Sequence, residues 1–271
     1  MRTSIRLGRF FGIPVGLSWS VLLIAGLLTL SLGTALLPDS APGASDAAYF
    51  FAAAVAAVLF FGSLLAHELA HAVVARRNGV EVEGITLWLL GGVARLGSEA
   101  RSAGAELRIA AVGPGMSFAL AVGFGVAAIA ADTLLLPALA VAVLGWLALI
   151  NAALAVFNLL PAAPLDGGRI LTGVLWAGHG DPYRARETAA RAGRVVGFGL
   201  IAFGVLGLLT PIPFGGPWTA LVGWFIVTTA AAEERLARRR RAIRTALLVQ
   251  PSYGDGSRPN QVTRPGGGVP L

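Results

Sequence analysis

The sequence predicts an all-helical, multi-pass membrane protein with a small β-hairpin at one membrane face. Hydrophobic residues make up 56% of the 271 residues and charged residues only 13%, whereas about a quarter of the residues are charged in an ordinary soluble protein. Mean hydropathy is +0.75, and the apolar residues form runs near the length of about 20 residues that crosses a bilayer. This composition excludes a soluble enzyme, a disordered chain and a free nucleic-acid-binding protein.

Six apolar runs predict about six transmembrane helices. They cover residues 17–37, 47–74, 109–131, 135–160, 195–209 and 218–232. The connections on one side contain no arginine, whereas the segments on the other side contain clusters of arginine. Short arginine-rich loops remain in the cytoplasm, so both termini are expected there. Residues 1–244 are expected to form one membrane domain, and residues 245–271 a disordered cytoplasmic tail rich in glycine, proline and polar residues.

A β-hairpin is expected between the second and third apolar runs. Apolar residues alternate with others over residues 80–89, Gly91 and Gly92 supply a turn, and residues 93–96 return as a second strand. Non-helical backbone is tolerated at membrane depth only where it is buried in protein or lines a cavity. The hairpin is therefore expected beside a functional cleft, with an ordinary surface hairpin as the alternative.

The second apolar run ends in a pattern typical of a metal site, His67-Glu68-Leu69-Ala70-His71. Residues four apart share one face of a helix, about 6 Å apart along its axis, so the two histidines can bind one zinc ion. Glu68 is then placed to accept a proton from the attacking water and deliver it to a leaving amine. Ionisable side chains are costly inside a membrane, which favours a functional role for this group.

Asp166 is the candidate for a third ligand that leaves one position open for water. It follows the fourth apolar run in the segment Asn-Leu-Leu-Pro-Ala-Ala-Pro-Leu-Asp-Gly-Gly-Arg. The prolines end the helix, and Gly167 and Gly168 let backbone approach closely, so the carboxylate can point back into the bundle. The alternative is an aspartate that only caps a helix. Arg169 is expected either to pair with Asp166 or to extend to the membrane interface, and His179 to lie at the surface.

The chain contains no cysteine, which excludes disulfides, cysteine nucleophiles and thiolate ligands. Any metal must therefore be bound through nitrogen and oxygen. Two imidazoles and one carboxylate favour a single zinc ion.

The two motifs and their order resemble the site-2 protease family of intramembrane zinc metalloproteases. The resemblance implies that His67, His71 and Asp166 hold zinc and that Glu68 is the general base. It implies that Asn158 helps to hold or polarise the substrate carbonyl. It also implies cleavage of a transmembrane helix near its cytoplasmic end, with the hairpin pairing with the substrate as an added strand.

The resemblance covers about residues 8–176, with two departures. Ser117 stands where an asparagine is usual in the Gly-Pro motif of the family's third helix. Residues 11–15 resemble a branch that often carries cystathionine-β-synthase-type domains, but neither these domains nor a PDZ-like insert is expected in this chain.

The sequence therefore predicts an intramembrane zinc endopeptidase of a bacterial cell membrane. Its expected partners are the lipid bilayer and a membrane-anchored regulatory protein that it cleaves, with no nucleic acid. One alternative is an inactive relative that binds transmembrane helices as a chaperone or adaptor, but such a binder has no need of the base Glu68. The second alternative is a metal or proton transporter. Such a protein would need a polar path across the membrane, which the apolar runs do not contain.

Overall fold

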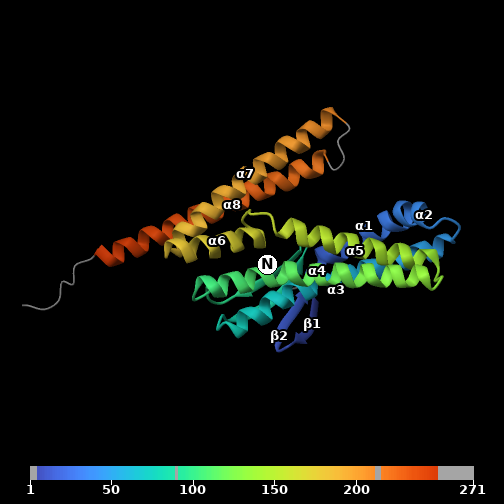
Figure 1. Cartoon of the computed structure of the whole chain (residues 1–271), viewed down its shortest axis with the longest axis horizontal. Coiled ribbons are helices and arrows are strands. Elements are labelled where there is room, and N and C mark those ends of the chain that lie inside the picture. Colours follow the sequence, from blue (N-terminus) through green and yellow to red (C-terminus); the bar gives the residue numbers. More distant parts are fainter. Residues whose placement is uncertain (1–4, 89–90, 211–214, 250–271) are drawn as a thin grey trace, which may run out of the picture.

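The computed structural model describes residues 5–88, 91–210 and 215–249 (Figure 1). Most of the expected tail, from residue 250 onward, lies outside the described residues. The helical elements are α1 (Trp19–Ser31), the π-helical η1 (Leu32–Leu36), α2 (Leu37–Ser40), α3 (Asp46–Arg77), α4 (Ala103–Thr133), α5 (Ala138–Asn158), α6 (Asp166–His179), α7 (Pro182–Leu209) and α8 (Pro217–Val249).

Within the described ranges, five helical segments are long and apolar enough to cross a membrane. They are the continuous segment Trp19–Ser40 and the helices α3, α4, α5 and α7. The polytopic helical class is thereby confirmed. The sixth expected run, residues 218–232, forms the first half of α8 but is not among the five, because its 15 residues are followed directly by Glu233, Glu234 and Arg235. The arginine-rich segment that follows, residues 235–244, continues the same helix.

The expected hairpin belongs to a larger sheet, which has four strands in the described part of the chain. The strands are β1 (Ile5–Phe10), β2 (Ile13–Leu17), β3 (Val82–Trp88) and β4 (Gly91–Leu96), in that order across the sheet. β1 and β4 pair antiparallel with their neighbours, whereas β2 and β3 are parallel, with Val15 opposite Ile85. Gly91 and Gly92 are the first residues of β4, so the expectation that they form the turn was wrong.

The sheet is fixed to the middle of α3 by an apolar core. Ile13, Val15, Ile85 and Leu87 from β2 and β3 are buried with Leu64 of α3. A second cluster joins α3 to α5 and the end of the first span. Since both clusters include the helix that carries the two histidines, the packing holds that helix on two sides.

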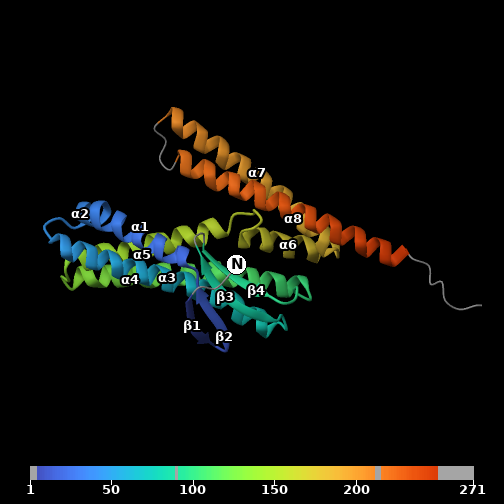
Figure 2. The same cartoon turned by 180° about the vertical axis from the view of Figure 1, so that it is seen from behind.

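The helices α1 to α5 lie together as a bundle, and α7 and α8 form a separate helical hairpin that leans away from it in both views (Figures 1 and 2). Glycines let α7 and α8 approach closely, because a Cβ at Gly197 would lie 2.9 Å from the Gly223 oxygen and one at Gly204 would lie 2.4 Å from the Ala220 nitrogen. The short helix α6 contacts both α4 and α7 and therefore connects the bundle to the hairpin.

Candidate metal centre

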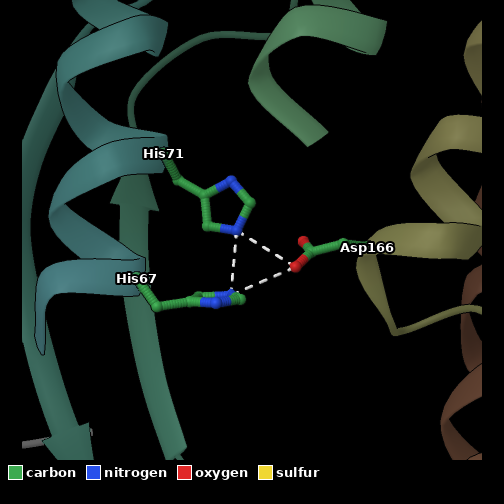
Figure 3. A group of neighbouring side chains, drawn as sticks. All are labelled: His67, His71 and Asp166. Atoms are coloured by element: carbon green, nitrogen blue, oxygen red, sulfur yellow. Dashed lines mark hydrogen bonds and ion pairs between the residues drawn. The ribbon is translucent and has the colours of Figure 1, made fainter. Parts of the chain in front are cut away.

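His67 and His71 lie one turn apart in the second half of α3. The helix begins at Asp46, where the Ser45 hydroxyl accepts a hydrogen bond from the Ala48 amide and so satisfies one free N–H group of the first turn. Both histidines are buried, with 3% and 6% of their surface exposed. Figure 3 shows their rings turned toward the same carboxylate, that of Asp166.

Asp166 reaches the histidines because it is the first residue of α6, directly after a tight turn. The glycine pair that follows makes this turn feasible. A Cβ on Gly167 would lie 2.2 Å from the Leu160 carbonyl oxygen, and one on Gly168 would lie 2.4 Å from the Ala163 nitrogen. The expected close approach of backbone at these glycines is therefore present in the fold.

The three candidate ligand atoms form a nearly equilateral triangle. His67 Nε2 lies 3.2 Å and His71 Nε2 3.1 Å from Asp166 Oδ2, and the two Nε2 atoms are 3.2 Å apart. Zinc bonds of about 2.0–2.1 Å with tetrahedral angles require ligand atoms about 3.3 Å apart. The spacing of the three ligand atoms therefore fits one zinc ion.

The charge of Asp166 suits this role. Burial disfavours its ionised form, but hydrogen bonds with His67 and His71 outweigh that effect and hold the pKa of the carboxyl below its ordinary value. Asp166 is thus a carboxylate at neutral pH, the form that binds a metal.

Two contacts from α4 orient the imidazoles. His71 Nδ1 lies 2.6 Å from the Ile109 carbonyl oxygen, which can only accept, so Nδ1 carries a proton and Nε2, which faces Asp166, is the nitrogen that a metal would use. His67 Nδ1 lies 2.9 Å from the Ser117 hydroxyl, which can accept from Nδ1 in the same way. Sequence reasoning identified Ser117 only as a departure from the family pattern and did not foresee either contact.

Gly113 of α4 lies against both candidate nitrogen ligands. A Cβ there would be 2.1 Å from His71 Nε2 and 2.7 Å from His67 Nε2. A side chain at this position would therefore displace the imidazoles, and glycine is required for α4 to pass so close to them. The glycine of a Gly-Pro sequence was the available signal for this close approach.

Glu68 lies beside the histidines and against β4. A Cβ on Gly92 would lie 2.1 Å from Glu68 Cγ, so the strand passes directly over this carboxylic side chain. The need for a residue without a side chain explains why Gly92 is within the strand.

The structure does not bring the other candidate residues into the group. Asn158 is the last residue of α5, and its amide nitrogen donates to the Leu154 carbonyl of the same helix, at 3.0 Å. His179 is exposed at the far end of α6, as expected. Arg169 pairs with Glu106 of α4 at 3.0 Å and not with Asp166.

The fold and the site define a multi-pass membrane protein with a buried group of two histidines and an aspartate that could hold a metal ion, next to a glutamate. The chain belongs to peptidase family M50, whose family model matches residues 55–136 and 125–200. This result confirms the resemblance to site-2 proteases.

Individual relatives agree with this membership. Rip3 of Mycobacterium tuberculosis, assigned as a zinc metalloprotease, is 50% identical over 234 residues, which are 86% of this chain and 59% of Rip3. A protein of Synechocystis with the same assignment is 39% identical over 238 residues, 88% of this chain and 62% of that protein. The chain thus spans about three fifths of the length of these curated relatives. The solved site-2 protease from Methanocaldococcus jannaschii has a similar structure, with a TM-score of 0.55 and 28% identity over 85% of this chain and 94% of that chain.

Proposed function

We propose that this protein is an intramembrane zinc endopeptidase that cleaves a transmembrane segment of a membrane-anchored regulatory protein near its cytoplasmic end. The observation that carries the proposal is the triangle of candidate ligand atoms from His67, His71 and Asp166, with Glu68 adjacent on a helix long enough to cross a membrane. Membership of a peptidase family supports the same activity.

The proposed mechanism assigns each residue one task. A zinc ion held by His67, His71 and Asp166 would polarise the scissile carbonyl and make the attacking water more acidic. Glu68 takes the proton from the attacking water and then gives it to the leaving nitrogen, so that the peptide C–N bond breaks. Asn158 would hold the substrate carbonyl, which requires its amide to leave the Leu154 oxygen that it contacts now.

The substrate would bind in an extended form along β4. This strand is at the edge of the sheet, where unpaired backbone groups can accept another strand, and its Gly92 lies against Glu68. A helical peptide bond is shielded by its own turn, so pairing with β4 would unwind the segment beside the base. The contact between Gly92 of β4 and Glu68 supports this part of the proposal.

The orientation proposed here has both termini on the cytoplasmic side of a bacterial membrane, which requires α8 to cross the membrane beside α7 in addition to the five apolar segments. The arginines of the last turn of α3 and of the second half of α8 support it, since short basic segments stay in the cytoplasm. The cleaved regulator would then release a cytoplasmic fragment.

Quantitative proteomics of membrane fragments tests the proposal, in cells that carry the native chain or Glu68→Ala. Uncleaved single-span membrane proteins should accumulate with Glu68→Ala, while the purified variant keeps its zinc because Glu68 is not a ligand. His67→Ala, in contrast, should lose both zinc and cleavage. Identical fragment profiles for the native chain and Glu68→Ala under several stresses would contradict a protease and favour the adaptor.

A further inference from the structure

A buried ion pair joins α4 and α6 and has no part in the proposed chemistry. Arg169 Nε donates to Glu106 Oε1 at 3.0 Å. The Glu106 side chain is 6% exposed and that of Arg169 is 31% exposed. An unpaired carboxylate as buried as Glu106 would be strongly unfavourable, so the fold depends on Arg169, its ion-pair partner among the described residues, to compensate the charge.

Each member of the pair lies one helical turn from a group of the candidate metal centre. Glu106 precedes Ile109, whose carbonyl accepts from His71 Nδ1, and Arg169 follows Asp166. Residues three apart on a helix are separated by about 4.5 Å along the axis and lie about 60° apart around it. The ion pair therefore joins α4 to α6 one turn away from the Ile109 carbonyl that contacts His71 and one turn away from the candidate ligand Asp166.

Close packing at Gly173 sets the separation between α4 and α6. A Cβ on Gly173 would lie 2.7 Å from Leu107 Cγ and 3.3 Å from the Ala103 carbonyl oxygen. This contact fixes how closely α6 approaches α4. A glycine contributes no side-chain ridge to such a contact, so Gly173 itself does not set how α6 is rotated about its axis.

We propose that Glu106 and Arg169 are a positioning pair that fixes the rotation of α6 and thereby aims the Asp166 carboxylate at the two histidines. The Arg169 guanidinium is held by a charge-assisted hydrogen bond to Glu106 of α4. Rotation of α6 would break that bond and leave Glu106 as a buried, unpaired charge. The inference rests on the proposed metal site. It adds that two residues that are not ligands, Glu106 and Arg169, control the affinity of that site for zinc.

Zinc release from the purified full chain tests this role without reference to proteolysis. The zinc-loaded protein is mixed with excess chelator, and the rate of zinc loss is compared between the native chain, Arg169→Gln and Arg169→Lys. Partners that orient metal ligands change affinity by about 10- to 100-fold, so Arg169→Gln should release zinc at least about 10-fold faster. Arg169→Lys keeps the positive charge and should be closer to the native rate.

Arg186→Gln is the matched control. Arg186 lines the same cavity of about 400 Å³ as Arg169 and Glu106, but it pairs with Glu99 at 2.9 Å and contacts no residue of α6 through that bond. This variant should release zinc at the native rate. Equal acceleration in Arg186→Gln and Arg169→Gln would overturn the proposal, because loss of any charge around the cavity would then have the same effect.

A double variant separates positioning from folding. Glu106→Leu combined with Arg169→Met leaves no unpaired buried charge, and such apolar replacements of buried ion pairs are often neutral for stability. We expect native helical content and thermal unfolding, together with fast zinc release. A folded double variant that releases zinc at the native rate would overturn the role of the pair. A native chain that binds no zinc would refute the metal site itself and is recognised before any variant is made.

Discussion

The Ser117 hydroxyl lies 2.9 Å from Nδ1 of His67, so a buried side chain of α4 contacts a candidate metal ligand of α3. Ser117 is fully buried, and its hydroxyl can accept a hydrogen bond from a protonated Nδ1. The proton is then held on Nδ1, and Nε2 is the nitrogen that can bind a metal. The residue that departs from the family pattern thus provides a polar contact at this position.

Ser117→Ala is expected to weaken zinc binding by about 10-fold. The variant removes the acceptor that selects the tautomer of His67, while the imidazole itself remains. Competition with a chelator of known affinity measures the change. Ser63→Ala is the control, because Ser63 is also buried and one turn before His67, but its hydroxyl donates to the Leu59 carbonyl of its own helix. Equal losses in the two variants would argue against a specific role for Ser117.

Gly113→Ala is expected to abolish zinc binding. The added methyl group would lie 2.1 Å from His71 Nε2, far inside a van der Waals contact, and would occupy space that the ligand atoms need. Zinc content of the purified protein checks this outcome. Gly115→Ala on the same helix should keep its zinc, because a Cβ there meets no atom within 4 Å. Retention of zinc by both variants would show that α4 does not pass as close to the histidines as the structure indicates.

The local part of the site could be predicted from the sequence, because spacing along one helix determines it. His67, Glu68 and His71 share their positions through the helical repeat alone. Asp166 could be added because a break in the fourth apolar run places it at the same membrane level. The structure brings His67, His71 and Asp166 together, whereas the amide of Asn158 contacts its own helix.

The contacts from α4 could not be predicted, because they depend on how this helix is rotated. In a soluble protein the apolar face of a helix marks the side that packs inward. In a membrane both lipid and core are apolar, and α4 has apolar residues all around. Nothing in its pattern therefore indicated that Glu106, Ile109 and Ser117 face the site.

The strands β1 and β2 were missed for a different reason. They are short, and β2 pairs with β3 across a long separation in sequence, with Leu17 opposite Leu87. The alternation of Ile13, Val15 and Leu17 after Phe11-Gly12 was the available signal. This alternation was overlooked because Leu17 also begins the first apolar run, residues 17–37.

Gly92→Ala should separate catalysis from metal binding. Its methyl group would lie 2.1 Å from Glu68 Cγ and would push either β4 or the glutamate away, while the ligand triangle is left intact. We expect zinc content to stay near the native level and cleavage of a membrane substrate to fall by at least about 100-fold, the lower end of what a general base contributes. Gly113→Ala is the contrasting variant, because it is expected to lose zinc. A Gly92→Ala variant that cleaves at the native rate would refute the close packing of β4 on the base.

The stability of the α7–α8 hairpin is expected to depend on pH. Glu234 of α8 contacts Arg191 at 3.1 Å and Arg194 at 3.0 Å, both on α7, and also Arg238. Burial raises the pKa of Glu234, but the hydrogen bonds from these arginines outweigh it and hold the pKa below its ordinary value of 4.5. A carboxyl whose pKa is lower in the folded state stabilises that state above its unfolded pKa, and this contribution is lost as the pH falls through the folded value.

The native chain should therefore lose thermal stability between about pH 6 and about pH 3, and Glu234→Gln should lose less over the same interval. The glutamine has no charge to titrate, so its midpoint of unfolding is lower than native at neutral pH and approaches the native value in acid. Thermal unfolding in detergent at both pH values measures the difference. Glu233→Gln, at the neighbouring position on α8, is the control and should follow the native profile. If Glu234→Gln and the native chain lost the same stability on acidification, the arginines around Glu234 would not stabilise its charged form.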